Sequence, residues 1–407
     1  MIPVSQAISL IEQNVRSLGI EELQIDSSVG SVLAEDIIAD MDLPPFDRSQ
    51  MDGFAVRADN VANTPVELKI VGESAAGHGW HDEMEKGEAV RIMTGARVPK
   101  GADTVQKVEL TSEYSFGSEG AQQTNGTVTI NESIAAGKNI VRQGDEVKKG
   151  EVIFRSGDRI DERMIATLAA FGYANVRVAK SPRVSIFTTG SEVVDVDQTP
   201  GIDQIRNSNS AMLSALVVTA AGTPSFLPSA VDDLEVIKQV IANAAHNSDM
   251  IVITGGVSVG KYDLTKKALV ELGAEIFFDR VRLKPGKPAV FARLGETLVF
   301  GLPGNPVSAA VTFYIFVRKA LLLMQNARET DLKKGTAVAG GPLKAAKERD
   351  TYLPAKLSID ESARLTVTPV KWVGSSDFIG FGKADALAFV PGSEKISEGE
   401  ITEFLFL

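Results

Sequence analysis

Residues 176–326 alternate between short apolar runs and longer amphipathic stretches, an order that few folds accommodate. The apolar runs predict strands at 184–188, 250–254, 289–291 and 298–300. The amphipathic stretches predict helices at 210–221, 234–245, 264–272 and 307–324. Because helical connections between strands favour parallel pairing, we predict a doubly wound α/β domain whose parallel sheet is covered by helices on both faces.

The segments on either side of this domain have a different pattern. Apolar residues at helical spacing predict helices at 5–18 and 161–171, the second ended by Gly172 as a C-cap. Short β-branched runs between Gly, Pro, Asn and Asp fill residues 44–140, and β-type runs return after residue 332. This pattern is typical of compact β-rich modules joined by turns.

The length of the chain requires several domains, since 407 residues exceed the roughly 250–300 over which a single core grows. We predict a multi-domain α/β plus β fold. Its parts are a discontinuous N-terminal domain (1–43 and 141–175), an inserted β-rich domain (44–140), the α/β domain (176–326) and a C-terminal β domain (327–407).

Charge and composition exclude several classes of protein. The formal net charge of −11 disfavours binding to nucleic acid or to an anionic membrane surface. The absence of cysteine excludes disulfides, thiolate nucleophiles and Cys-based metal sites, and we interpret the three histidines as solvated. The start of the chain lacks the features of a signal peptide, and apolar stretches such as 311–317 are short for a membrane span. We expect a soluble, cytoplasmic protein.

Three strands of the α/β domain run into glycine-containing loops, at 188–192, 254–260 and 301–306. In doubly wound sheets, ligands bind beyond the carboxyl ends of the strands, and glycine lets the backbone approach them. The middle loop matches G-x-x-x-x-G-K through Gly255, Gly260 and Lys261, but Tyr262 stands where a P-loop needs Ser or Thr. We interpret it as an anion-binding loop rather than an NTPase motif.

Acidic residues follow three of the predicted strand ends, namely Glu192, Asp232 and Asp263. Mg²⁺ prefers one or two carboxylates together with substrate phosphates and water, so such a rim suits this ion. Asp232 and Asp263 each also precede a predicted helix, where an aspartate commonly serves as the N-cap. Both interpretations stay open.

Residues 283–288 place Lys284 and Lys287 around a Pro-Gly turn. Proline restricts the backbone and can hold both ammonium groups on one side, which suits a phosphate or another tetrahedral oxyanion. Exposed lysines in an ordinary turn are the alternative. Residues 44–57 and 91–99 mix prolines, apolar residues and charges, although by composition each could be merely a structural turn.

Six segments together resemble the MoeA family, the molybdopterin molybdenumtransferases that also form the catalytic half of gephyrin-type proteins. They are PPFDRSQMDGFAVR at 44–57, RIMTGA at 91–96, TGSE at 189–192, GGVSVGKYD at 255–263, KPGKP at 284–288 and GLPGNPVS at 301–308. Each segment is modest alone, but in this order and spacing they extend the resemblance over essentially the whole chain.

The resemblance implies a four-domain, elongated homodimer whose central domain is similar to MogA. It implies a Mg²⁺-dependent transferase that takes adenylylated molybdopterin and molybdate and releases molybdenum cofactor and AMP. An adenylyltransferase partner is compatible with it.

The same resemblance implies roles for individual residues. Glu192, Asp232 and Asp263 match the family's acidic, metal-binding positions. Asp52 and Thr94 match active-site positions that would reach the α/β domain of the other subunit.

Further positions would bind the substrates. Lys284 and Lys287 match oxyanion-contacting lysines, while Ser308 and Arg349 match positions implicated in holding molybdate. The remaining expected binding residues lie in two glycine-containing loops and are Gly255, Gly256, Ser258, Pro303, Asn305 and Pro306.

Two departures from the family pattern stand out. Asn207 replaces the aspartate of the usual Asp-Ser-Asn or Asp-Thr-Asn, and Ser376 replaces the second glycine of a Gly-Ser-Gly.

Two other functions remain as alternatives: a molybdopterin adenylyltransferase, and a dimeric scaffold without catalysis. A stand-alone adenylyltransferase would not need the segment that contains Asp52. A scaffold without catalysis would not need the acidic residues and lysines at the matched positions.

Overall fold

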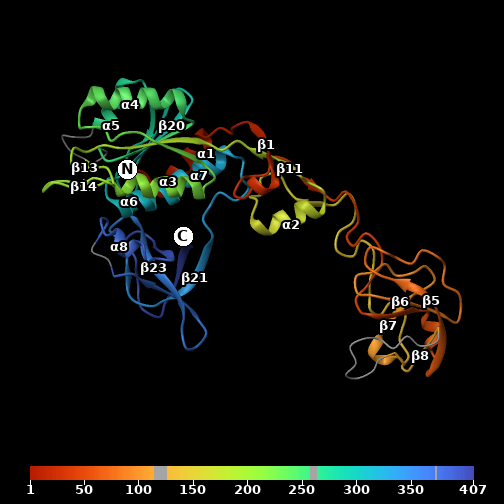
Figure 1. Cartoon of the computed structure of the whole chain (residues 1–407). Helices are drawn as coiled ribbons and strands as arrows, with labels where there is room; N and C mark the ends of the chain where they lie inside the picture. Colours follow the sequence, from red (N-terminus) through yellow and green to blue (C-terminus); the bar gives the residue numbers. More distant parts are fainter. Residues whose placement is uncertain (114–125, 257–263, 372–373) are drawn as a thin grey trace. The chain divides into compact units, whose positions relative to one another are not determined.

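The computed structural model describes residues 1–113, 126–256, 264–371 and 374–407 (Figure 1). Internal contacts divide the chain into two compact units. Unit 1 comprises Met1–Glu35, Arg155–Ala169 and Tyr173–Leu407, and unit 2 comprises Asp36–Phe154 and Ala170–Gly172.

A six-stranded sheet forms the centre of unit 1, in the order β15-β12-β16-β20-β19-β17. Its strands are β12 (Arg183–Thr188), β15 (Thr223–Phe226), β16 (Met250–Thr254), β17 (Glu275–Phe278), β19 (Val290–Leu294) and β20 (Thr297–Leu302). The first four in spatial order pair in parallel, which agrees with the predicted parallel sheet, although the sequence did not predict β15 as a strand.

The prediction of a wholly parallel sheet is wrong for the remaining two strands, of which β17 was not predicted from the sequence. β19 pairs antiparallel with β20, and β17 pairs antiparallel with β19. Only Gly295 and Glu296 separate β19 from β20, and so short a connection can join antiparallel neighbours only.

Helices cover both faces of the sheet, which confirms the doubly wound prediction (Figure 1). Successive residues of a strand point to opposite faces: Met250 and Val252 pack into one core, and Ile251 and Ile253 into the other. The helices are α3 (Ser208–Thr219), α4 (Leu234–Asn247), α5 (Leu264–Glu271), α6 (Pro306–Thr312), the π-helical turn Phe313–Val317 and α7 (Arg318–Met324).

The last three of these helical segments form one continuous run, Pro306–Met324. Among the described helices it is the one with the length and composition needed to cross a bilayer, and it is longer than the stretch 311–317 noted from the sequence. In the fold, 83% of its apolar window is buried. Most of this helix is therefore packed against other parts of the protein.

The N-terminal helix α1 (Val4–Asn14) packs Val4, Ala7 and Ile11 into the core that surrounds this long helix. The prediction of a helix to residue 18 is wrong, because Val15 is already extended. The chain then turns so that the amide of Leu18 donates to the carbonyl of Met324 at 2.8 Å, a contact that local sequence does not encode.

Two distant segments of unit 1 meet in β1 (Ile20–Gln24) and β11 (Asn175–Ala179), which pair antiparallel. Between them in sequence lie the 3₁₀ turn Ile25–Ser27 and α2 (Glu162–Ala170). The amide of Tyr173 donates to the carbonyl of Leu168 at 3.0 Å, and Gly172 has a φ of 76°. This Schellman-type ending confirms Gly172 as a C-cap residue.

Unit 2 is β-rich, as predicted, and contains a five-stranded sheet in the order β7-β4-β6-β5-β8. Buried residues on the two faces of this sheet form two small cores. The strands of the unit are β2 (Ile37–Ile38), β3 (Arg48–Ser49), β4 (Gly53–Val56), β5 (Val66–Ser74), β6 (Glu88–Ile92), β7 (Thr104–Lys107), β8 (Thr127–Ile130), β9 (Ile140–Val141) and β10 (Val152–Phe154), with 3₁₀ turns at Ala58–Val61 and Val108–Leu110.

The C-terminal part of unit 1 is a closed barrel of five strands, in which β23 pairs with both β24 and β25 and so completes the ring. Its strands are β21 (Lys334–Ala339), β23 (Asp350–Ile359), β24 (Leu365–Pro369), β25 (Ala386–Val390) and β27 (Ile401–Phe406). Three short strands and a helical turn accompany the barrel, namely β18 (Leu283–Lys284), β22 (Leu343–Lys344), β26 (Lys395–Ile396) and α8 (Phe378–Phe381).

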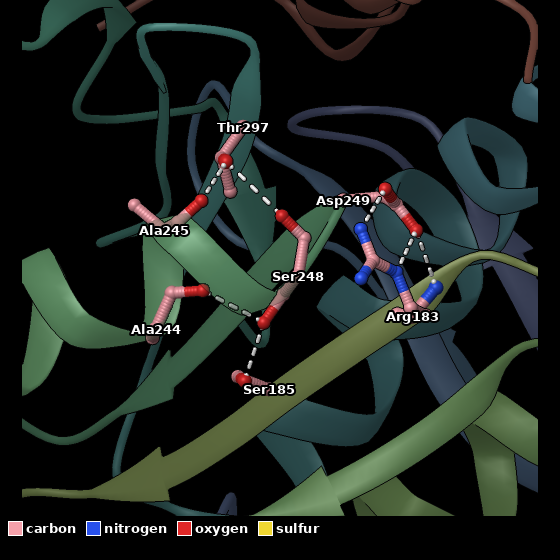
Figure 2. A network of polar contacts seen from close by, with 7 residues as sticks. All are labelled: Arg183, Ser185, Ala244, Ala245, Ser248, Asp249 and Thr297. Carbon is pink, nitrogen blue, oxygen red and sulfur yellow. Dashed lines mark hydrogen bonds and ion pairs between the residues drawn. The ribbon is translucent and has the colours of Figure 1, made fainter.

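A buried polar network ties together the amino ends of three parallel strands (Figure 2). The Ser185 and Ser248 hydroxyl oxygens lie 2.5 Å apart, and Ser248 donates to the carbonyl of Ala244 at 2.9 Å. The Thr297 hydroxyl donates to the carbonyl of Ala245 at 2.9 Å. This edge of the sheet is therefore fixed by hydrogen bonds within the chain.

Candidate functional site

A large pocket of about 1040 Å³ opens at the opposite edge of the sheet, beyond the carboxyl ends of β12, β16 and β20. All three glycine-containing loops contribute to its wall, as the sequence predicts for this edge. The lining comprises Thr188, Thr189, Gly190, Glu192, Val193, Pro200, Gln204, Ile205, Arg206, Asn207, Ser208, Asn209, Asp232, Gly255, Gly256, Pro288, Pro303, Gly304, Asn305, Pro306, Ser376 and Phe378.

Close packing of the backbone explains why glycine is needed in the middle loop. Gly255 has a φ of 91°, and a Cβ built on it would lie 2.5 Å from the carbonyl oxygen of Thr189. A side chain there would push the first two loops apart.

Two predicted acidic residues, Glu192 and Asp232, are exposed and line this pocket. The N-cap interpretation is wrong for Asp232, because its neighbour Asp233 caps α4 by accepting from the amide of Val236 at 3.0 Å. The carboxylate of Asp232 is therefore free of that role.

Other predicted residues fall outside the part of the chain that the structure describes. They are Ser258 and Asp263, together with the Lys261 and Tyr262 of the P-loop-like sequence.

A smaller pocket of about 470 Å³ holds the predicted cationic residues. Lys284, Lys287 and Arg349 line it with Ser308, and Ser308 is only 5% exposed. The strand β18 brings them together, because Leu283 pairs with Asp350 at the start of β23 and so sets Lys284 beside the barrel. No described carboxylate forms an ion pair with these three cations.

Three residues, Pro288, Pro303 and Asn305, line both pockets. We call them the shared wall. Asn305 donates from Nδ2 to the hydroxyl oxygen of Ser375 at 2.9 Å, and the amide of Val307 donates to the carbonyl of Ser375 at 3.1 Å. The connection between β24 and β25, which contains Ser375, thereby supports the wall from one side.

Asp52 and Thr94 also lie together, within unit 2. Asp52 Oδ1 accepts from the Thr94 amide at 2.6 Å and from the Thr94 hydroxyl at 2.8 Å, and the pair is exposed. The described residues that line the two pockets all belong to unit 1.

Comparisons with known proteins cover nearly the entire chain. Residues 2–172 match the family described as MoeA N-terminal region (domain I and II), 185–322 match the probable molybdopterin binding domain, and 336–407 match the MoeA C-terminal region (domain IV). A molybdopterin molybdenumtransferase of Staphylococcus aureus is 33% identical over 97% of this chain and 92% of its own length. The chain belongs to the MoeA family.

Two further relatives support the assignment to the MoeA family. The molybdopterin molybdenumtransferase of Bacillus subtilis is 32% identical over 97% of this chain and 91% of its own length. The crystal structure of the molybdopterin biosynthesis MoeA protein of Pyrococcus horikoshii superposes with a TM-score of 0.84, at 29% identity and full coverage of both chains. The expected fold class of the family is confirmed.

Asn209, to which the sequence motifs of this MoeA-family chain assign no role, joins three elements of the large pocket. Its Nδ2 donates to Thr254 Oγ1 at 2.9 Å and to the Gly304 carbonyl at 2.7 Å. The Thr254 hydroxyl in turn donates to the carbonyl of Pro303 at 3.1 Å. The start of α3 thus holds the shared wall against the end of β16.

Of the two departures from the MoeA pattern, Asn207 has a structural role and Ser376 lines a pocket. Asn207 caps α3 by accepting from the amide of Ser210 at 3.0 Å, and it also accepts from the Thr188 hydroxyl at 3.2 Å. Asparagine serves as an N-cap as well as aspartate does, so the helix start is preserved. Ser375 lines the small pocket and Ser376 the large one.

Proposed function

We propose that this chain is a molybdopterin molybdenumtransferase, which moves molybdenum from molybdate into adenylylated molybdopterin with Mg²⁺-dependent release of AMP. The observation that carries the proposal is the pair of adjoining pockets with a shared wall of Pro288, Pro303 and Asn305. One pocket has the size and loops for a nucleotide-linked ligand, and the other concentrates positive charge.

The small pocket suits molybdate, a tetrahedral dianion. Lys284 and Lys287 contribute ammonium groups, and Arg349 contributes a guanidinium with several donors in a fixed plane. Cations without carboxylate partners attract an oxyanion more strongly than paired ones. Because the buried Ser308 is held rigidly in α6, the anion would be fixed rather than diffusely attracted.

The large pocket suits the pyrophosphate that links pterin to AMP. Loop backbone without a side chain lets phosphate oxygens approach closely, and Gly304 is such a position, because a Cβ built on it would have only the Cα of Gly255 within 4 Å, at 3.6 Å. The shared wall would keep molybdate next to the pterin end of this ligand, so that metal insertion follows without diffusion of either reactant.

The donor set of the large pocket fits Mg²⁺. Glu192 and Asp232 offer two exposed carboxylates, and no described cluster of three or more His, Cys, Asp or Glu competes as a site for another metal. The two carboxylates would hold the ion, and Asp263 would join them. Bound there, Mg²⁺ would neutralise charge on the pyrophosphate and so favour departure of AMP.

Homodimerisation and a shared site remain part of the proposal. The support is the exposed Asp52–Thr94 pair, whose hydrogen bonds order the carboxylate without burying it. A four-domain division is supported by the matched regions 2–172, 185–322 and 336–407. A cytoplasmic location and an adenylyltransferase partner stay predictions from the sequence.

The decisive experiment mixes the purified protein with adenylylated molybdopterin, molybdate and Mg²⁺. We expect stoichiometric AMP and a cofactor that activates an apo-molybdoenzyme. Release of pyrophosphate from ATP and molybdopterin, with no AMP from the adenylylated substrate, would contradict the proposal and favour an adenylyltransferase.

Lys287→Ala tests the small pocket separately. Loss of one of three cations should raise the molybdate concentration for half-maximal activity by about 10-fold, as expected for one charge-assisted contact of roughly 1.5 kcal/mol. Lys267→Ala, which removes an exposed lysine from α5, is the matched control. An unchanged molybdate dose response in Lys287→Ala would count against the assignment of the small pocket.

A further inference from the structure

Phe378 differs from every other described residue of the large pocket in being aromatic. Its side chain is 51% exposed, although removing water from the faces of a phenyl ring is energetically favourable. The rest of the lining consists of loop backbone, polar and charged side chains, and aliphatic residues such as Pro200 and Ile205. An open ring in this setting offers a flat apolar surface to whatever enters the pocket.

The position of this ring is set by the backbone around it. Asp377 caps α8 by accepting from the amide of Gly380 at 2.9 Å, which orients the first turn that carries Phe378. Ser375 is bound to Asn305 at 2.9 Å and to Val307 at 3.1 Å, so the segment is attached to the shared wall. At the other end of α8, Phe381 packs against the large core of unit 1.

We infer that Phe378 is a specificity-determining residue that stacks on a fused, nitrogen-containing ring of the ligand. The inference rests on the proposed function, whose substrate has two such rings, the adenine and the pterin. Stacking suits either, since each is a flat π-system that can cover the exposed face of the phenyl group. Phe378 contributes neither charge nor a hydrogen bond, so it should affect ring recognition and not phosphate binding.

Three variants test whether the phenyl ring of Phe378 contributes to ligand binding. Phe378→Ala removes the platform, and Phe378→Trp keeps an aromatic surface. Ile379→Ala is the matched control, because Ile379 is 66% exposed on the same helix but is not among the described lining residues. Calorimetry would measure the binding of AMP, ribose 5-phosphate and 6-carboxypterin to the full-length protein and to each variant.

We expect Phe378→Ala to weaken binding of one ring compound by about 5- to 100-fold, the range found when a base loses an aromatic stacking partner. Ribose 5-phosphate binding should not change, Phe378→Trp should retain ring binding, and Ile379→Ala should behave as the unaltered protein. A loss confined to AMP identifies adenine as the stacked ring, and a loss confined to 6-carboxypterin identifies the pterin.

The inference is overturned if neither ring compound is affected, or if ribose 5-phosphate is weakened equally. It also fails if the unaltered protein binds neither ring compound. The AMP-release assay decides the proposed function independently, so a protein that releases AMP without recognising either ring would separate the two ideas.

Discussion

The two edges of the central sheet are built in opposite ways. At the amino ends of the strands, the hydroxyls of Ser185, Ser248 and Thr297 are buried and hydrogen-bonded (Figure 2). At the carboxyl ends, Thr189 Oγ1 and Asn209 Oδ1 are buried without a hydrogen-bond partner among the described residues. The same sheet is thus closed by its own polar groups at one edge and left incompletely bonded at the other.

This difference separates stability from binding. A buried hydroxyl with its partner contributes about 1 kcal/mol, whereas a buried polar atom without one costs about 1–3 kcal/mol. The amino edge therefore stabilises the domain. The carboxyl edge is less stabilised where glycine loops and exposed carboxylates form a pocket, so substitution of those carboxylates should affect ligand binding more than folding.

Asp232→Ala tests the binding edge. We expect AMP release to fall on the order of 100-fold, the scale of losing one charged group that stabilises a transition state. The melting temperature should stay unchanged, since the Asp232 side chain makes no described hydrogen bond or ion pair. Activity and melting temperature are measured on the same preparation.

The adjacent aspartate is the matched control. Asp233→Ala removes the N-cap of α4 and should cost about 1 kcal/mol of stability, while AMP release stays intact. If Asp233→Ala lost activity and Asp232→Ala did not, the roles of the two residues would be reversed.

Ser248→Ala tests the stabilising edge. The substitution deprives Ser185 of its acceptor and the Ala244 carbonyl of its donor, and both groups are buried. We expect a cost of about 1–3 kcal/mol, seen as a melting temperature lower by roughly 2–10 °C. AMP binding by the folded protein should be unaffected.

A second substitution shows whether the network acts as a unit. The double variant Ser185→Ala/Ser248→Ala should be less destabilised than the sum of the single variants, because it removes both hydroxyls of the pair. A loss of AMP affinity in folded Ser248→Ala would contradict the separation between the edges.

Much of the binding edge could be predicted because its signals are local. Strand-then-glycine patterns identified the three loops, and Lys284 and Lys287 lie in one pocket as their spacing indicated. The choice between Asp232 and Asp233 as N-cap could not be made, since two adjacent aspartates satisfy the same pattern. Which one caps α4 depends on the residue at which the backbone turns into the helix.

Other features depend on contacts between distant residues. Asn209 meets Thr254 and Gly304, which lie 45 and 95 positions away in the sequence. After the early end of α1, the amide of Leu18 bonds to the carbonyl of Met324, which is far away in the sequence. The antiparallel orientation of β19 could not be predicted for a different reason. The predicted strands 289–291 and 298–300 leave residues 292–297 between them, whereas in the structure both strands are longer and only Gly295 and Glu296 connect them.

The smallest predicted effect, and the one whose sign matters most, is that of replacing Thr265, which is compared with Thr254 because both are 0% exposed. Thr254 Oγ1 accepts from Asn209 and donates to Pro303, whereas Thr265 Oγ1 has no partner among the described residues. Valine keeps the shape of threonine and removes the hydroxyl. Thr265→Val should therefore leave stability unchanged or raise it by up to about 1 kcal/mol, whereas Thr254→Val should lower it by about 1–3 kcal/mol. Thermal unfolding of the two variants measures the difference in stability. Equal destabilisation would contradict the prediction, because it would mean that the Thr265 hydroxyl is hydrogen-bonded in the folded protein.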